Sequence, residues 1–271
     1  MVSTVRQPAV AGRFYPGEPS RLRADLKNYL EPAPEKTIKA LGCVVPHAGY
    51  MYSGHVAGAV YRKLELPSRF LLLCPNHTGM GEPLAVVSEG AWETPLGPVP
   101  IDTELASNLK AKLPLLHEDS LAHRREHAVE VHLPFLQVLV KEFRFVPIVV
   151  GTSNFEVLSA LGVVIGNVLR ETGEPVLIIA SSDMNHYEDD DTTRVKDSLA
   201  IEQVLERNPL GLYQTVQGQQ ISMCGYGPAI AMLTAAGRLG AQKAELIKYA
   251  TSGDISGDRN EVVGYAGIVV Y

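Results

Sequence analysis

Residues 175–187 read PVLIIASSDMNHY, an apolar run that ends abruptly in polar side chains. A strand that is apolar at nearly every position is expected when helices cover both faces of a parallel sheet. The carboxyl ends of parallel strands gather at one edge of such a sheet, where residues distant in the sequence can meet. This stretch therefore predicts an α/β fold and places Asp183 and His186 at an edge suited to an active site.

Five further apolar runs repeat this pattern, and helical patterns separate them. The runs are ALGCVV (40–45), RFLLLC (69–74), PLAVVS (83–88), FRFVPIVV (143–150) and VVGYAGIVV (262–270). Helices are expected at residues 20–30, 54–64, 102–113, 129–142, 154–172, 192–207 and 228–239. The alternation predicts a three-layer α/β/α fold around a central sheet that is mostly parallel or mixed.

Two loops between these elements have recognisable roles. Residues 90–102, GAWETPLGPVPID, are rich in proline and glycine between two apolar stretches, which predicts a hairpin or rim loop. Asp102 at its end is expected to cap the next helix. The acidic residues 188–191, EDDD, are expected to stabilise the N-terminus of another helix. No linker-like shift in composition interrupts the chain, so residues 1–271 are expected to form a single domain.

The composition limits the classes of function. The chain has 271 residues, a net charge of -6 and no basic stripe, which argues against a nucleic-acid partner and favours small molecules or proteins. Cys43, Cys74 and Cys224 are widely spaced and odd in number, so a reducing compartment is expected. No stretch reaches the ~18 apolar residues of a membrane-spanning helix, and the amino terminus has no signal-like apolar core. We therefore expect a cytoplasmic protein without membrane contact.

His47 and His77 both stand where an apolar run gives way to a turn. His47 follows LGCVVP, and Pro46 cannot supply the N–H that would continue a strand. His77 follows FLLLCPN in the same way. A histidine in such a place is either held structurally by hydrogen bonds or available as a metal ligand. The repetition at two strand ends favours metal binding.

Cys224, Asp183 and His186 add further chemistry. Cys224 lies in SMCGYGPAIAMLTAAG, before a helix predicted to begin at Pro228, and such a location lowers a thiol pKa and favours the thiolate. Its alternative is a small buried hydrophobic residue, as expected for the other two cysteines. Asp183 beside His186 can orient the ring, raise its basicity or ligate a metal. The alternative is a turn-capping Asp183 with an exposed His186.

The segment REHAVEVHLPFLQVLVKEF (125–143) is predicted to be helical and contains His127, Glu130 and His132. His127 and Glu130, three residues apart, would share a helix face and form a second metal site or an acid/base pair. His127 is expected to line the pocket. His132, five positions from His127, would point elsewhere and be structural. Aromatic residues that either line the pocket or serve packing are Tyr50, Tyr52, Trp92 and Tyr226.

Several catalytic motifs do not occur in the sequence. There is no G-x-S-x-G, no phosphate-binding G-x-x-x-x-G-K-S, no H-E-x-x-H and no strand-to-helix G-x-G-x-x-G. A nucleotide-dependent or hydride-transferring enzyme therefore has no support.

The sequence resembles the Memo-like family, called component B of the AmmeMemoRadiSam system in bacteria and archaea. The resemblance runs almost from end to end and rests on RQPAVAGRFYPG (6–17), PHAGYMYSG (46–54), LCPNHTG (73–79), WETPLGPVPID (92–102), EHAVEVHLPFLQ (126–137), SSDMNHY (181–187), MCGYGPA (223–229) and SGDISGDRNEVVGYAGIVVY (252–271). So many separated motifs in the same order are highly specific. The resemblance implies a fold similar to that of class III extradiol (LigB-like) dioxygenases.

The resemblance also implies roles for individual residues. His47 and His77 match family histidines that correspond to metal ligands in the dioxygenases, and Cys224 matches a cysteine that takes the place of their ligating glutamate. Asp183 would be an additional or alternative ligand, and His186 a candidate acid/base. The resemblance implies iron first as the divalent metal, and because a thiolate is softer than a carboxylate, copper and zinc are alternatives. A cysteine beside activated oxygen is oxidisable, so the resemblance does not simply imply the ring-cleaving reaction of the dioxygenases.

Three functions are therefore weighed. The first is a metal-dependent redox enzyme with iron or copper on His47, His77 and Cys224, in which His186 and His127 move protons. The second is a non-catalytic component that binds a protein or peptide, because the resemblance implies AMMECR1-like and radical-SAM partners. The third is a zinc-dependent hydrolase, since two nitrogens, one sulfur and an open position also suit catalytic zinc.

Overall fold

The computed structural model describes residues 5–33 and 36–271, in which helices and strands alternate. The strands are β1 (Val5–Arg6), β2 (Gly42–Val45), β3 (Arg69–Pro75), β4 (Leu84–Val86), β5 (Ala91–Trp92), β6 (Val99–Pro100), β7 (His117–Glu118), β8 (Arg144–Val150), β9 (Leu177–Ser181), β10 (His186–Glu188), β11 (Ala244–Thr251) and β12 (Val262–Val270). The helices are α1 (Pro19–Leu30), α2 (Tyr50–Lys63), α3 (Thr103–Lys112), α4 (Ser120–His123), a 3₁₀ turn η1 (Glu130–His132), α5 (Leu133–Leu139), α6 (Phe155–Thr172), α7 (Asp190–Leu205), α8 (Pro209–Gly218), α9 (Tyr226–Leu239) and α10 (Gly253–Ser256). None of the helices in these ranges has the length and apolar character needed to cross a bilayer.

The central sheet is mixed, with a parallel core. Its order is β10-β12-β2-β9-β3-β8-β4-β7, and β11 pairs with β12 outside this path. The four central strands β2, β9, β3 and β8 run parallel. On one side of them β12 runs antiparallel to β2, and on the other side β4 runs antiparallel to β8. The expected mostly parallel or mixed sheet is confirmed.

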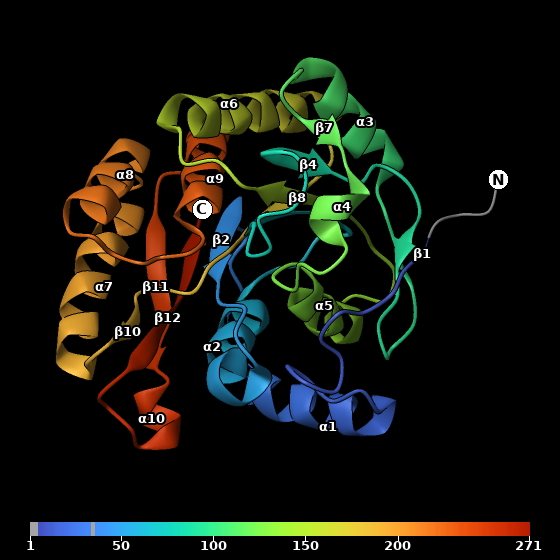
Figure 1. Cartoon of the computed structure of the whole chain (residues 1–271). Helices are drawn as coiled ribbons and strands as arrows, with labels where there is room; N and C mark the ends of the chain where they lie inside the picture. Colours follow the sequence, from blue (N-terminus) through green and yellow to red (C-terminus); the bar gives the residue numbers. More distant parts are fainter. Residues whose placement is uncertain (1–4, 34–35) are drawn as a thin grey trace.

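Two hydrophobic cores lie on opposite faces of the sheet. Alternate residues of β3 belong to opposite cores: Leu71 and Leu73 to the core that includes residues of α3, α6, α7, α8 and α9, and Leu72 and Cys74 to the core that includes residues of α1, α2 and α5. Figure 1 shows α6 and α9 on one side of the central strands and α1, α2 and α5 on the other. A sheet buried on both faces explains why its strands are apolar at nearly every position. The three-layer α/β/α architecture is confirmed.

The register of the parallel strands brings the polar loops to one edge. Val45 at the end of β2 is paired with Ser181 at the end of β9, and Leu73 of β3 is paired with Ala180. The residues that follow these three neighbouring strands therefore emerge side by side. They include His47, Asp183 and His77, the residues that the sequence placed at strand ends.

The loop predictions were largely confirmed. β5 and β6 form an antiparallel hairpin within residues 90–102, and Asp102 caps α3 by accepting a hydrogen bond from the N–H of Leu105. Asp189 caps α7, and Asp190 and Asp191 occupy its first turn. By contrast, the helix expected at 129–142 is much shorter: it begins as the turn η1 and ends at Leu139.

Candidate metal centre

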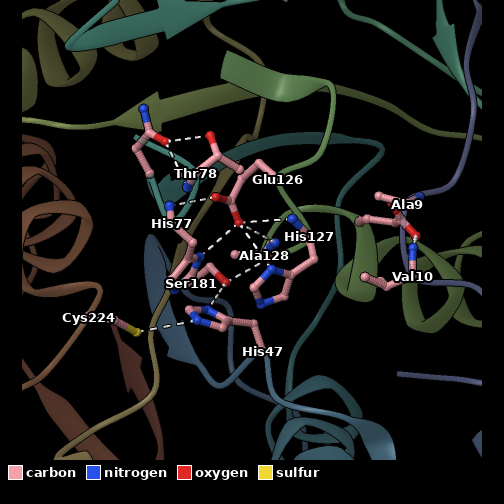
Figure 2. Close-up of polar contacts among 12 residues, drawn as sticks. Ala9, Val10, His47, His77, Thr78, Glu126, His127, Ala128, Ser181 and Cys224 are labelled. Carbon is pink, nitrogen blue, oxygen red and sulfur yellow. Dashed lines mark hydrogen bonds and ion pairs between the residues drawn. The ribbon is translucent and has the colours of Figure 1, made fainter. Parts of the chain in front are cut away.

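Three side chains from separate loops converge at the carboxyl edge of the parallel strands. One ligand atom each from His47, His77 and Cys224 lies within 4.8 Å of the other two. His47 Nε2 is 3.3 Å from Cys224 Sγ, a contact drawn in Figure 2. His47 is almost fully buried, Cys224 is half-buried and His77 is exposed. The site therefore combines one buried ligand with two that solvent can reach.

His47 is fixed from both its backbone and its ring. Its backbone N–H donates to Asp183 Oδ1 at 2.8 Å, and its ring Nδ1 is 2.8 Å from Ser181 Oγ. Burial lowers the pKa of His47 well below its usual value, with the neighbouring histidines adding to the effect. The ring is therefore neutral near pH 7, with Nε2 directed at Cys224, as a metal-ligating imidazole requires.

His77 is held by a residue that the sequence did not single out, Glu126. The carboxylate of Glu126 accepts from the backbone N–H of His77 at 2.7 Å and lies 2.9 Å from its Nδ1 (Figure 2). Burial lowers the pKa of His77, but the hydrogen bond and charge of Glu126 outweigh burial, so that this pKa lies above its usual value. An Nδ1–H donated to a carboxylate leaves Nε2 for a ligand, the arrangement common to metal-binding histidines.

Glu126 is better placed to support the site than to ligate. His77, Glu126 and His127 also bring three ligand atoms close together. However, the fully buried carboxylate of Glu126 additionally accepts from the backbone N–H groups of His127 and Ala128 at 2.9 and 3.0 Å. With its oxygens occupied by these donors, Glu126 orients His77 from behind. No periodic pattern in the sequence marked this residue, because it lies in a loop.

Cys224 reaches the site because the next residue is glycine. A Cβ at position 225 would lie 2.2 Å from the carbonyl oxygen of Ser181 and 2.5 Å from Cβ of Ser182, so only glycine allows this loop to pack against the end of β9. The helix that follows begins at Tyr226, two residues before the expected Pro228. The expected lowering of the thiol pKa was wrong: burial, together with the charge of Asp183, raises the pKa of Cys224.

Asp183 lies inside the site and His186 at its rim. Asp183 Oδ2 is 3.9 Å from His47 Nε2, and burial raises the pKa of this carboxyl to about 6 despite the hydrogen bond from the His47 N–H. His186 is partly exposed; its N–H donates to Ser222 Oγ at 2.7 Å and its Nδ1 is 3.0 Å from the Ser222 carbonyl. Asp183 is thus near enough to join the metal-binding group, while His186 is near enough to His47 and His77 for their charges to lower one another's pKa values, and it stays a candidate acid/base.

The predicted pairing of His127 with Glu130 was wrong. His127 lies in the turn before η1 instead of on a helix, and its ring stacks on His77 with centroids 4.7 Å apart. Burial lowers the pKa of His127 to about 4, so it is neutral at the site. The buried carboxylate of Glu130 instead holds the N-terminal segment: it contacts Arg6 Nη1 and the Tyr15 hydroxyl, each at 2.7 Å, as well as two backbone N–H groups.

His132 and most of the aromatic candidates have packing roles. His132 is buried between the Tyr61 hydroxyl and Ser181 Oγ, beneath His47. The structural role predicted for His132 agrees with this position. Tyr50 and Trp92 are buried in the core, Tyr52 packs beside Tyr265, and Tyr226 lies near Tyr213.

The donor set fits a transition-metal ion. In a tetrahedral site with nitrogen at ~2.0 Å and sulfur at ~2.3 Å from the metal, the nitrogen and sulfur atoms are roughly 3.5 Å apart. The 3.3 Å between His47 Nε2 and Cys224 Sγ is close to that separation. Both histidines have Nδ1 engaged by a partner behind the ring. Two nitrogens and one sulfur suit iron, copper or zinc better than magnesium or calcium.

The buried carboxyl of Asp197 makes the stability of this region depend on pH. It accepts from the N–H of Asn185 at 2.8 Å and the Tyr249 hydroxyl at 2.7 Å, and so anchors the segment between Asp183 and His186. Burial raises the pKa of Asp197 to about 7, from about 4 in an unfolded chain. A carboxyl with a raised pKa stabilises the folded state at low pH, and this contribution is lost as the pH rises from about 4 to about 7.

We expect Asp197→Asn to flatten the pH dependence of stability. The wild-type free energy of unfolding should lose roughly 2–4 kcal/mol from this group between about pH 4 and about pH 7, since each pKa unit corresponds to about 1.4 kcal/mol. The asparagine cannot ionise, so its urea unfolding profile should lack that loss. Asp191→Asn, at an exposed position in the first turn of the same helix, is the matched control. Parallel profiles for wild type and Asp197→Asn would contradict the assignment.

Comparisons with known proteins agree with this fold. The family model described as "Memo-like protein" matches residues 6–269. A MEMO1 family protein of Methanosarcina barkeri is 45% identical over 267 residues, which cover 98% of this chain and 100% of the relative. A MEMO1 family protein of Archaeoglobus fulgidus is 44% identical over 265 residues, with 98% and 99% covered.

A solved structure adds support for the fold alone. An uncharacterized protein of Escherichia coli K12 is 13% identical and superposes with a TM-score of 0.58, covering 85% of this chain and 100% of the other. The family match spans the loops that carry His47, His77 and Cys224. The chain belongs to the Memo-like family.

Proposed function

We propose that the protein is a metal-dependent oxidoreductase that uses iron or copper bound by His47, His77 and Cys224. The observation that supports this most is the convergence of two imidazoles and a thiol at one edge of the sheet, each imidazole with Nδ1 already engaged. A thiolate is an electron-rich, soft donor that suits copper and iron. A bound iron or copper ion would supply electron transfer to or from a substrate.

The chain's own residues would orient the substrate and move protons. The pKa values of His127 and His186 are both lowered by burial, so both rings are unprotonated near pH 7 and would act as weak bases that hold a proton only transiently. His127 lies inside, stacked on His77, and His186 lies at the rim. Asp183, with its pKa raised to about 6 by burial, is a third group that can exchange a proton near neutral pH.

Metal reconstitution tests this function. Protein stripped with a chelator under anaerobic conditions is reloaded with iron, copper or zinc, and oxygen consumption is measured with ascorbate as the reductant. We expect iron or copper, but not zinc, to support consumption above that of the free ion, and His47→Ala to abolish the increase. His117→Ala, which removes an exposed histidine on β7, should behave as wild type.

Two outcomes would contradict the proposal. If no redox metal binds, or if the His47→Ala variant consumes oxygen as fast as wild type, the redox function fails. If zinc alone restores an activity to the stripped protein, such as ester hydrolysis, the donor set serves the hydrolase chemistry for which zinc is also suited.

A further inference from the structure

We propose that Ser181 is a positioning residue that fixes which nitrogen of His47 carries the proton, and thereby directs the Nε2 lone pair at the metal position. The role of Ser181 in directing a ligand rests on the proposed metal site, whereas its hydrogen bonds do not depend on a metal. The hydroxyl of Ser181 lies at the end of β9 and is the meeting point of three buried groups. They are His47, His132 and the backbone carbonyl of Ala128.

The distances leave one consistent set of hydrogen-bond directions. Ser181 Oγ is 2.8 Å from His47 Nδ1, 2.7 Å from His132 Nε2 and 2.8 Å from the Ala128 carbonyl oxygen. A hydroxyl has one proton to donate and two lone pairs with which to accept, whereas a carbonyl can only accept. The serine proton therefore goes to Ala128, and both imidazoles must donate to the serine oxygen.

These hydrogen-bond directions also fit the groups at both ends of the network. His132 protonated on Nε2 has a free lone pair on Nδ1, which accepts from the Tyr61 hydroxyl at 2.8 Å. His47 protonated on Nδ1 has its lone pair on Nε2, the nitrogen 3.3 Å from Cys224 Sγ. In this network each donor thus meets an acceptor, as expected of buried polar groups.

Because these groups are buried, the network allows no other set of hydrogen-bond directions. His47 and His132 are 1% exposed, and Ser181 and Tyr61 are fully buried. No solvent is at hand to satisfy a proton placed on the wrong nitrogen. The two ligand histidines are therefore held by different means: His77 by the carboxylate of Glu126, and His47 by a neutral hydroxyl that is itself held by the Ala128 carbonyl.

The network also supplies its own matched control. In Tyr61→Phe, His132 loses its donor and is free to exchange tautomers. In either tautomer Ser181 keeps a lone pair for His47 Nδ1–H, so His47 is unaffected. In Ser181→Ala, the acceptor for His47 is gone. Two removals of a buried hydroxyl from one network should thus have different consequences at the site.

The test is ring nitrogen NMR on the full-length, ¹⁵N-labelled, metal-free protein, with His47 assigned by the loss of its signals in His47→Gln. We expect wild type and Tyr61→Phe to show His47 protonated on Nδ1 only, and Ser181→Ala to show a mixture or the other tautomer. Zinc affinity, measured by competition with a chelator, should fall about 10- to 100-fold in Ser181→Ala and less than about threefold in Tyr61→Phe.

Either of two results would overturn the inference. One is a wild-type His47 protonated on Nε2, which is decisive even if Ser181→Ala does not fold. The other is a folded Ser181→Ala that keeps both the wild-type tautomer and the wild-type zinc affinity. If the oxygen-consumption test fails but wild-type His47 is protonated on Nδ1, the proposed function is wrong and the role of Ser181 is still supported.

Discussion

Replacing Cys224 with serine is expected to weaken binding of a soft divalent ion by on the order of 10²–10³-fold while the fold remains intact. Structural zinc sites with four ligands bind with roughly 10–16 kcal/mol, or about 2.5–4 kcal/mol per ligand, and about 1.4 kcal/mol corresponds to a factor of ten. The thiol is partly exposed and lies in a loop, so its replacement should disturb packing little. The effect should therefore be seen in metal binding and not in stability.

Cobalt(II) provides the measurement, because a thiolate ligand gives a sulfur-to-metal charge-transfer band. We expect the band in wild type and in the control Cys43→Ala, whose sulfur is buried in β2, and not in Cys224→Ser. Because burial raises the pKa of Cys224, metal uptake must displace a proton, and the affinity should rise with pH. An unchanged band and affinity in Cys224→Ser would exclude Cys224 as a ligand.

Replacing Glu130 with alanine is expected to lower the free energy of unfolding by about 3–5 kcal/mol, the usual effect of removing one partner of a buried ion pair. The carboxylate is fully buried and receives hydrogen bonds from the Arg6 guanidinium, the Tyr15 hydroxyl and the backbone N–H groups of Ala9 and Val10. Its loss would leave a largely buried guanidinium without its counter-charge and two amides without an acceptor.

The comparison is made by urea unfolding against Glu104→Ala. Glu104 is also paired with an arginine, Arg69, at 3.5 Å, but its side chain is 65% exposed. Exposed ion pairs contribute about 0–1 kcal/mol, so this control should be close to wild type. Equal stability of the two variants would show that Glu130 does not anchor the N-terminal segment.

The positions of His47, His77 and Asp183 were predictable because they depend on strands. Near-continuous apolar runs mark strands buried on both faces, and the polar residues after parallel strands must emerge at one edge. β2, β9 and β3 are neighbours in the sheet, so these three residues were bound to lie close together. The central sheet, the layers and most helix positions follow from the same periodic signals.

The supporting residues were not predictable from local patterns. Glu126 lies in a polar loop, and only the folded chain shows that His77, His127 and Ala128 donate to it. The expected lowering of the Cys224 pKa failed because burial outweighs a helix N-terminus at this position. The helix predicted around His127 and Glu130 was too long, because a polar turn precedes η1. The carboxylates of Glu126 and Glu130 also face different partners.

Among the elements that escaped prediction, β11 and α8 did so for a different reason. β11, with the sequence AELIKYAT, pairs with β12 alone among the described strands, and its charged residues belong to an exposed edge strand. Such charges are usual on sheet edges, where they discourage pairing with other chains, but they hide the alternation of a strand. α8 is a short helix capped by Asn208, and its main contacts are with α7 and α9. Tertiary packing, more than local preference, explains its formation.

The most direct test of the central claim is an anomalous difference map from crystals of the full chain loaded anaerobically with iron or copper. One peak per chain is predicted within bonding distance of His47 Nε2, His77 Nε2 and Cys224 Sγ, with nitrogen at ~2.0 Å and sulfur at ~2.3 Å. That peak should be absent in Cys224→Ser crystals treated in the same way. A peak at another position, or a metal bound without Cys224, would contradict the claim.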